Sequence, residues 1–373
     1  MRVGIFSPYL PKHYGGGEKH VLATAEFLSR QHEVTIFIPT STENIEAAQA
    51  QYESFFDLDL SRVQWQPSTL ADRTLKSWQI WSLTRQFDVF LYATDGSIFL
   101  SGAKKSILHV QIPFTNQHRG LWPRKKLNSW NVINTNSEFT KEVIESHWNT
   151  AVDVIHYPYV DTAQIPFSPD MRKQRQILAV GRFYDPEHTD VHAKRQDVLV
   201  ETFKRGCKEL GWDKRNWQLH LVGAVEPDSV HTAFVTRLKK AAQGFPIFFH
   251  HDISHTELSD LYAKSRFFWH AAGYGVDETT HPQKVEHFGM STIEAMARGT
   301  LPVVTDKGGL KETVDHGENG FRFSTDDELL SYTHELMGLK TDERATWAQR
   351  ARTKAEQFSL ERFHHTIDQM LSM

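Results

Sequence analysis

The stretch HPQKVEHFGMSTIEAMARGT, residues 281–300, decides how the rest of the chain is interpreted. It contains two glutamates, Glu286 and Glu294, on either side of a turn sequence that begins at Phe288. Carboxylates accept hydrogen bonds from pairs of hydroxyl groups, so two carboxylates that reach one ligand from two sides suit a polyol. The stretch therefore predicts a binding site for a ligand rich in hydroxyl groups.

The turn between the two glutamates predicts a second kind of contact with the same ligand. Its residues are Phe288, Gly289, Met290 and Ser291. Ser291 is expected to cap a helix over 292–298, because a serine oxygen accepts hydrogen bonds from the first N–H groups of a helix. The turn would then offer free backbone N–H groups to a phosphate or sugar oxygen.

The size and composition of the chain are typical of a two-domain globular protein. It has 373 residues, of which 39% are hydrophobic and 24% charged, and a single core rarely serves a chain of this length. The net charge of −4 argues against a protein that coats nucleic acid. The single cysteine, Cys207, excludes an intramolecular disulfide and a cysteine-rich metal site. The N-terminus shows no apolar signal sequence and the chain no apolar run of about 18 residues, which predicts a cytoplasmic protein.

Strand-like runs alternate with amphipathic helical patterns along the whole chain, which predicts α/β domains with parallel sheets. Strands are expected at 2–7, 33–38, 87–93, 106–112, 131–135, 152–157, 177–183, 218–222, 247–250, 267–271 and 301–305. Helices are expected at 16–30, 196–210 and 360–371, with a further one through residue 147 that Ser137 caps.

The alternation breaks between residues 158 and 176, a segment rich in proline and polar residues. We interpret it as a linker between a domain over 1–165 and a second domain over 166–357. A final helix over about 358–373 could pack back on the first domain. The expected fold is therefore two Rossmann-like β/α/β domains that face each other across a deep cleft. Ligands of such sheets bind beyond the carboxyl ends of the strands.

Three consecutive glycines, Gly15, Gly16 and Gly17, follow the first expected strand and open a helix. Glycines in this position let backbone N–H groups approach an anion, and the helix dipole favours negative charge. The spacing is not that of a dinucleotide-binding loop, so a nicotinamide cofactor is not indicated. The alternative is a plain flexible turn.

Two cations stand near the start of the second half of the chain. Arg182 follows Gly181 at the end of a strand, and Lys194 comes just before the next helix. An arginine fork and a lysine point charge that converge at strand ends suit a diphosphate; the alternative is two solvated surface cations. Asp57 and Asp59 have the spacing of a divalent-metal motif, but they lie far from any glycine-rich phosphate site, and we expect no metal site.

Together these motifs resemble those of GT-B retaining glycosyltransferases, in particular the large GT4 family. The resemblance covers most of the chain and rests on five segments: GGGE from Gly15, VGRF from Val180, HAKRQD from His192, EHFGMSTIEAMARG from Glu286 and PVVTDKGGLKETV up to Val314. It implies that Glu294 holds the ribose hydroxyls of a nucleotide. It also implies that Glu286 holds hydroxyls of the donor sugar.

The same resemblance implies a catalytic set of His109, Arg182, Lys194 and Glu286. Arg182 and Lys194 would grip the diphosphate, and His109 matches a family histidine near the anomeric carbon. The alternative for His109 is a buried core histidine on a strand. The glycines at 15–17 and the turn over 288–291 would join Glu294 in donor binding.

The implied activity is transfer of a hexosyl group of mannose or glucose type from a UDP- or GDP-sugar to an acceptor hydroxyl. The resemblance implies that the anomeric configuration is retained and that neither a metal nor another cofactor is needed. Two other functions stay open, namely a GT-B sugar-nucleotide epimerase and a non-catalytic GT-B subunit that binds a partner. The loops over 187–191 and 277–281 are longer than in many relatives, so the identity of the donor is not carried over.

The expected partners are a nucleoside diphosphate sugar and a saccharide or lipid-linked acceptor, with no nucleic acid. Residues 118–126 mix the cations Arg119, Arg124, Lys125 and Lys126 with Trp122, in the half of the chain where family members bind acceptors. A peripheral membrane contact of this cytoplasmic protein is one hypothesis for the segment. A solvated loop is the alternative.

Overall fold

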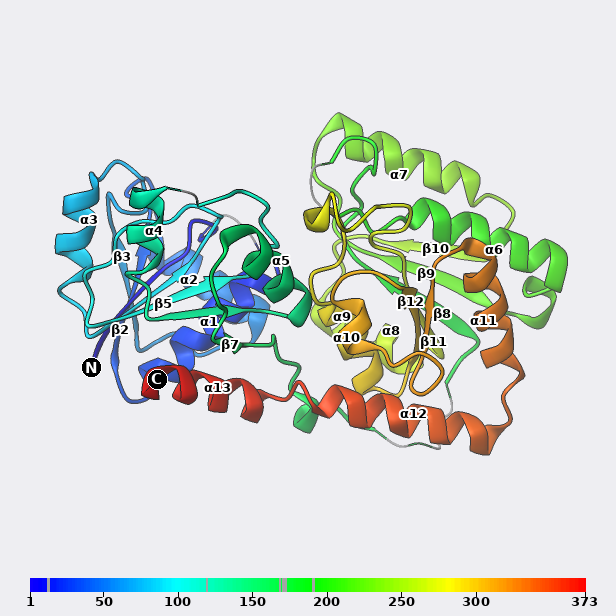
Figure 1. Cartoon of the computed structure of the whole chain (residues 1–373). Helices are drawn as coiled ribbons and strands as arrows, with labels where there is room; N and C mark the ends of the chain where they lie inside the picture. Colours follow the sequence, from blue (N-terminus) through cyan, green and yellow to red (C-terminus); the bar gives the residue numbers. More distant parts are fainter. Residues whose placement is uncertain (12–13, 119, 168, 170–172, 190–191) are drawn as a thin grey trace. The chain divides into compact units, whose positions relative to one another are not determined.

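The computed structural model describes the chain except residues 12–13, 119, 168, 170–172 and 190–191 (Figure 1). Part of the expected linker, at 168 and 170–172, therefore lies outside the described residues. The chain divides into two compact units. Unit 1 comprises Met1–Tyr159 with Glu361–Met373, and unit 2 comprises Val160–Leu360. The roles expected for the two domains stay predictions.

The sheet of unit 1 has seven parallel strands in the order β3-β2-β1-β4-β5-β6-β7. Its inner strands are almost entirely buried, as expected for strands that are covered on both faces. They are β1 (Arg2–Phe6), β2 (Glu33–Ile38), β3 (Val63–Pro67), β4 (Val89–Ala93), β5 (Lys105–Val110), β6 (Val132–Thr135) and β7 (Val154–Ile155).

The helices of unit 1 lie on both faces of this sheet. They are α1 (Gly16–Ser29), α2 (Ile45–Phe56), α3 (Ser77–Thr84), α4 (Leu121–Leu127), α5 (Glu138–Trp148) and α13 (Leu360–Ser372). The strand order reverses at β1, and right-handed crossovers therefore place α1 and α2 on one face and α3, α4 and α5 on the other. Ser137 caps α5 by accepting a hydrogen bond from the backbone N–H of Thr140, as predicted.

The sheet of unit 2 has six parallel strands in the order β10-β9-β8-β11-β12-β13. The strands are β8 (Gln176–Val180), β9 (Gln218–Val222), β10 (Ile247–His250), β11 (Phe267–His270), β12 (Leu301–Thr305) and β13 (Phe321–Phe323). The helices are α6 (Gln196–Leu210), α7 (Ser229–Ala241), α8 (His255–Lys264), α9 (Met290–Ala297), α10 (Leu310–Thr313), α11 (Asp326–Gly338) and α12 (Thr341–Glu356). The predicted pair of Rossmann-like parallel sheets is thus confirmed. The strand order of unit 2 changes direction between β8 and β11, where such sheets bind ligands.

Two strands differ from the prediction because their sequences do not carry a long apolar run. β3 alternates polar and apolar residues at the edge of its sheet, and β13 has only three residues. The strand expected at 152–157 shortens to Val154–Ile155, since the Glu145 carboxylate accepts the hydrogen bond of the Val152 N–H at 2.9 Å. Among the described helices, none combines the length and the hydropathy needed to cross a bilayer.

Candidate active site

Three side chains of unit 2 meet at one carboxylate oxygen beyond the ends of β8 and β11. Lys194 donates a hydrogen bond from Nζ to Oε2 of Glu286. The Nε2 atom of His270, the last residue of β11, lies 3.0 Å from the same oxygen. His192 lies farther off, with Nε2 at 4.0 Å. The structure therefore brings Lys194 and Glu286 together, 92 positions apart in the chain.

The electrostatics of this group keep the carboxylate charged in a buried place. Burial alone would raise the pKa of Glu286, but Lys194, His192 and His270 hold that pKa well below its usual range. Burial lowers the pKa of His270 below its ordinary value, against the opposing effect of Glu286. A neutral His270 keeps Nε2 at 3.0 Å from Oε2 of Glu286, outside regular hydrogen-bond geometry, while its Nδ1 accepts a long hydrogen bond from the Ala272 backbone at 3.4 Å. The site thus combines one anion, one cation and a neutral imidazole.

Gly181 explains how Lys194 crosses the end of β8. A Cβ atom at Gly181 would lie 2.5 Å from Cγ of Lys194, so only glycine leaves room for the lysine stem. Gln196 donates from Nε2 to the backbone oxygens of Gly181 and Arg182, each at 3.1 Å. The side chain of Arg182 donates to the hydroxyl of Tyr184 at 2.9 Å. Arg182 therefore shares the strand end with Lys194, although its guanidinium is directed to Tyr184.

The turn after Glu286 differs in one respect from the prediction. Helix α9 begins at Met290, and its cap is Gly289, which has φ +100 and no side chain that could accept a hydrogen bond from the helix. Ser291 is therefore not the cap, and that prediction was wrong. The reason is the left-handed conformation of Gly289, which lets the chain enter the helix two residues earlier. The N–H groups of Met290 and Ser291 have no acceptor within the helix, whereas that of Thr292 donates to the Gly289 backbone oxygen at 3.0 Å.

A second glycine turn supports the first. The N–H of Gly309 donates to the backbone oxygen of Glu286 at 2.9 Å, and a Cβ atom at Gly308 would lie 2.2 Å from that same oxygen. Gly308 in turn donates to Oε2 of Glu278 at 2.7 Å, and Glu278 also pairs with Lys311. The long loop at 277–281 is therefore tied to the turn that carries Glu286.

Glu294 lies one turn into α9, where its Oε2 atom accepts a hydrogen bond from the hydroxyl of Tyr262 at 2.9 Å. Tyr262 is fully buried, and burial raises its pKa well above the ordinary value, so it stays a donor. Arg298 lies over the Tyr262 ring, 5.3 Å from its centre, and donates to the backbone oxygen of Glu294. The carboxylate is thus held in one orientation.

In unit 1 the glycine loop and the end of β5 lie together. Gly15 caps α1 in an extended conformation, and a Cβ atom at Gly17 would lie 2.4 Å from the side chain of Gln111, the residue after β5. Two positions earlier, His109 is 1% exposed. Its Nδ1 atom lies 2.6 Å from Oδ1 of Asn134 on β6. Asn134 donates from Nδ2 to the Leu108 backbone, so His109 is the donor in this contact.

His109 belongs to a cluster of three buried histidines that has His20 at its centre. The ring of His20, from α1, stacks on His109 at 4.2 Å. Nε2 of His20 lies 3.0 Å from Nδ1 of His156. Phe363, from α13, packs on both His20 and His156. This burial also fits the alternative of a core histidine, and the catalytic role of His109 stays a prediction.

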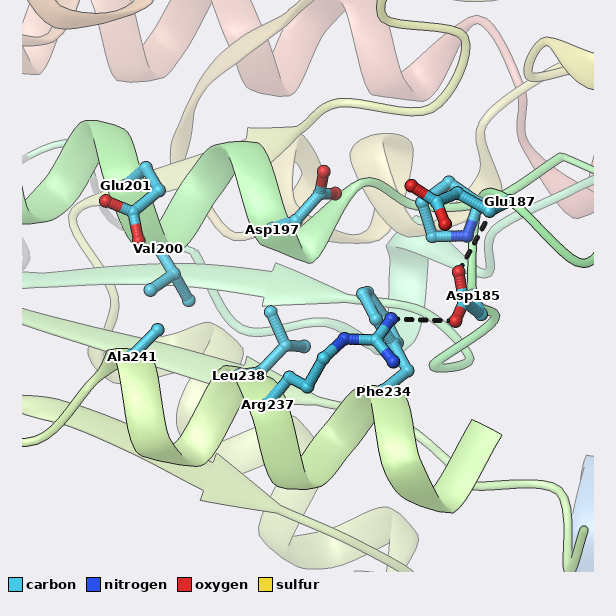
Figure 2. Close-up of a pocket in the computed structure, with 10 residues that line it drawn as sticks. Asp185, Glu187, Asp197, Val200, Glu201, Phe234, Arg237, Leu238 and Ala241 are labelled. Atoms are coloured by element: carbon cyan, nitrogen blue, oxygen red, sulfur yellow. Dashed lines mark hydrogen bonds and ion pairs between the residues drawn. The ribbon is translucent and has the colours of Figure 1, made fainter. Parts of the chain in front are cut away.

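One group of potential metal ligands lies in unit 2. Within the described part of the chain, one group gathers three such ligands, namely Asp185, Glu187 and His188. Figure 2 shows that Asp185 faces Arg237 across a groove between α6 and α7, and the two pair at 2.8 Å. An arginine on the buried carboxylate competes with a cation there. In unit 1, Asp57 is the C-terminal cap of α2, and Asp59 accepts a hydrogen bond from the Ser61 N–H. Both residues therefore stabilise the loop that follows α2.

Sequence reasoning assigned no role to four residues of the site: His192 and Gln196, which lie within the HAKRQD segment, and Tyr262 and His270. His270 could have been found, because it closes a buried strand at the carboxyl end, where functional residues gather. Tyr262 could not, since its link to Glu294 joins α8 to α9 and depends on helix packing.

A comparison with protein families matches residues 162–354 to the family described as glycosyl transferases group 1. Among curated proteins, the GDP-Man:Man(3)GlcNAc(2)-PP-Dol alpha-1,2-mannosyltransferase of Dictyostelium discoideum is 26% identical over 199 residues, which are 52% of this chain and 36% of that protein. The glycogen synthase of Chlorobium chlorochromatii is 41% identical over 90 residues, which are 23% of this chain and 18% of that protein. The matches therefore span about a third or less of these relatives.

Solved structures share the fold over the full length. The structure of Anabaena HepE in complex with UDP and glucose superposes with a TM-score of 0.70 at 16% identity and covers 100% of this chain and 99% of HepE. The sucrose-phosphate synthase of Thermosynechococcus elongatus gives a TM-score of 0.69 at 15% identity, with 100% and 98% covered. At this identity the likeness establishes the GT-B fold.

Proposed function

Because the chain belongs to the glycosyl transferases group 1 family, we propose that it moves a hexosyl group of mannose or glucose type from a nucleoside diphosphate sugar to an acceptor hydroxyl. The observation that carries the proposal is the contact of Lys194 and His270 with one oxygen of Glu286 at the carboxyl edge of the sheet. A buried anion beside a cation suits a ligand that carries both hydroxyl groups and phosphate oxygens.

In the proposed reaction the bound donor replaces the contacts of Glu286 with Lys194 and His270 by contacts between these residues and the donor itself. The diphosphate takes Lys194 and the backbone N–H groups at the start of α9, and Glu286 turns its oxygens to hydroxyls of the sugar. Glu294, held by Tyr262, accepts the ribose hydroxyls. As the bond between the anomeric carbon and the diphosphate oxygen breaks, charge grows on the leaving group, and Lys194 with Arg182 stabilises it.

The acceptor oxygen then forms its bond to the anomeric carbon on the face that the diphosphate leaves, which retains the configuration. The acceptor proton passes to an oxygen of the leaving diphosphate. The donor is a UDP- or GDP-sugar in this proposal, supported by relatives of both kinds: the name of the Dictyostelium protein contains GDP-Man, and HepE was solved with UDP and glucose.

Product analysis tests the proposal. The protein is incubated with GDP-mannose or UDP-glucose and a panel of saccharide acceptors, and the products are identified by mass spectrometry. Free nucleoside diphosphate together with a new α-glycoside is the expected result. A rearranged nucleotide sugar would instead identify a sugar-nucleotide epimerase, and unchanged donors would favour the non-catalytic subunit.

Two variants connect the activity to the site. Lys194→Ala and Glu294→Ala should each lower turnover by about 100-fold or more, the usual effect of losing one such group. Lys204→Ala serves as the matched control, because Lys204 is a half-buried lysine of the same unit whose ion pair is with Glu201 along α6. Equal activity in all three variants would place the reaction elsewhere.

The acceptor is proposed to bind unit 1. Within the segment expected to contact it, Arg124 donates to the backbone oxygen of Asn149 at 2.6 Å, and His118 packs against Trp148. Arg119 lies outside the described residues. Arg124 therefore has a structural role beside any role in acceptor binding, and substitutions that test the segment should leave it in place.

A further inference from the structure

Unit 1 exposes large apolar side chains on two helices of the same sheet face. Trp78 and Trp81 of α3 are 67% and 37% exposed, and Leu121 and Trp122 of α4 are 95% and 65% exposed. Exposed apolar residues are ordinary when scattered singly. Here they recur on two short helices that lie on the face opposite α1 and α2.

The segment at 101–102 joins the two helices. The N–H of Gly102 donates to Oγ1 of Thr84 in α3 at 2.8 Å. The N–H of Ser101 donates to Oγ of Ser129, two residues after the end of α4, at 3.0 Å. A Cβ atom at Gly102 would lie 3.0 Å from the Trp81 ring. The C-terminal ends of α3 and α4 therefore border consecutive residues on the same face of the sheet. We call the exposed side chains of the two helices the α3–α4 face.

The charge of these segments is one-sided in a chain whose net charge is −4. Residues 73–86 contain three cations, and residues 117–131 contain four, with no Asp or Glu in either segment. Lys76, Arg85 and Lys125 are exposed. Arg85 and Lys125 lie over the rings of Trp81 and Trp122, at 5.1 and 5.3 Å. The flanking carboxylates Asp88 and Asp95 pair with Lys104 and Arg73.

Tryptophan with lysine or arginine is the combination that suits the boundary between water and lipid. The indole ring is apolar with one polar N–H, and it partitions to the level of the lipid headgroups. Cations near the surface of an anionic leaflet contribute about 1 kcal/mol each. A surface that binds a protein partner would be expected to carry fewer cations, since charged residues are depleted at the centre of protein interfaces.

We propose that the α3–α4 face docks on the surface of an anionic lipid bilayer, with Trp78, Trp81 and Trp122 at the headgroup level. The contact is peripheral and reversible, because it involves side chains and no spanning segment. It would bring unit 1 to the surface from which a lipid-linked acceptor is reached. The docking itself does not depend on the proposed transferase activity.

Co-sedimentation with vesicles tests the proposal without any assay of activity. The whole protein should sediment with vesicles that contain phosphatidylglycerol, sediment little with pure phosphatidylcholine, and be released at high salt. Lys76→Ala/Arg85→Ala/Lys125→Ala/Lys126→Ala should weaken partitioning by about 100-fold or more. Trp78→Ser/Trp122→Ser should weaken it as well, since it removes the apolar part of the contact.

A control variant distinguishes the loss of any exposed apolar side chain from the loss of one on the α3–α4 face. Phe55 is 55% exposed on α2, on the opposite face of the same sheet, and Phe55→Ser should leave binding unchanged. Unchanged melting temperatures show that the variants are folded. Absence of binding to anionic vesicles, or binding that the quadruple variant retains in full, would overturn the proposal. Weaker vesicle binding of Lys76→Ala/Arg85→Ala, which leaves residues 118–126 intact, together with full transfer to a water-soluble acceptor would support docking and leave the transferase proposal intact.

Discussion

At the scale of single residues, the site depends on what surrounds Glu286. A buried carboxylate is unfavourable unless it is paired and hydrogen-bonded, and Glu286 is 9% exposed with Lys194 and His270 at one oxygen. The sequence predicted Lys194 and Glu286 because both belong to recognisable motifs. It did not predict that they touch, since that contact follows from the order of the strands.

Substitution of His270 tests whether this residue acts by positioning and charging Glu286. His270→Phe removes a donor from Glu286, and we expect turnover to fall by about 10-fold or more, with the pKa of Glu286 raised. His270→Gln restores a donor and should recover part of the loss. Steady-state rates from pH 5 to 8 would show the changed pKa as a loss of activity that begins at higher pH in His270→Phe. Identical pH profiles in the three proteins would contradict this role.

Glycine at 308 is required by the close approach of two turns. Gly308 has φ +53, and a Cβ atom would lie 2.2 Å from the Glu286 backbone oxygen. Gly308→Ala should therefore displace the turn that carries Glu286. Donor affinity should fall clearly, while the melting temperature should change little. Gly317→Ala is the control, since Gly317 also has a positive φ but no atom lies within 4 Å of the added carbon.

At the scale of elements, strands with a run of large apolar residues were predictable, and β3 and β13 were not. Glu33–Ile38 and Leu301–Thr305 are almost entirely buried and were predicted to the residue. The edge strand Ile247–His250 was predicted to the residue as well, because it contains three consecutive large apolar side chains. β3 lies at an edge and alternates with glutamine, so it lacks that pattern. The start of α9 was placed too late, because the sequence shows a serine that could cap but not the positive φ of Gly289.

The histidine cluster couples α1, β5 and α13, and it predicts how unit 1 responds to acid. Burial lowers the pKa of His20 and of His156 well below the ordinary value and that of His109 to about 4, from 6.5. Between pH 6.5 and about 4, His109 is protonated in the unfolded chain and neutral in the folded one, so the unfolded chain binds more protons. The free energy of unfolding should therefore fall as the pH falls from 6.5 to about 4, by about 1.4 kcal/mol per pH unit for His109 alone.

Urea unfolding at a series of pH values measures this dependence. His109→Phe should flatten it, whereas His255→Gln, at an exposed position on α8, should not. A free energy of unfolding that stays constant between pH 6.5 and 4.5 would show that the cluster does not resist protonation.

Arg352 shows how a helix end and a loop are held in unit 2. It is 8% exposed, and its guanidinium donates to the backbone oxygens of Thr162 and Ala297, each at 2.6 Å. Arg352→Met leaves those oxygens without their donor, and the free energy of unfolding should fall by about 2 to 4 kcal/mol. Arg350→Met, at an exposed position of the same helix, should change it by less than about 0.5 kcal/mol. Chemical denaturation of both variants checks the difference.

At the scale of the whole molecule, two Rossmann-like units divide the proposed work. Unit 2 carries the residues proposed for the nucleotide sugar, and unit 1 carries the glycine loop, His109 and the α3–α4 face. The family match falls on unit 2, as expected if donor binding is the shared part. The acceptor is poorly specified by sequence because no motif in unit 1 is as distinctive as the two glutamates.

The proposed reaction needs no metal, because Arg182, Lys194 and backbone N–H groups stabilise the leaving diphosphate. We expect transfer to proceed at full rate in EDTA. The measurement is the initial rate with and without chelator, and with Mn²⁺ added back. Strict dependence on Mn²⁺ would contradict the scheme.

The most direct test of the central claim is a thermal unfolding series with UDP, GDP, UDP-glucose and GDP-mannose. A ligand at 100 times its Kd adds about 2.7 kcal/mol of stability, so the nucleotides of one base should raise the melting temperature of the wild-type protein. The same nucleotides should leave Lys194→Ala and Glu294→Ala unshifted, while Lys204→Ala responds as the wild type does. A folded wild-type protein that responds to none of the four would contradict the account of a nucleotide-sugar site in unit 2.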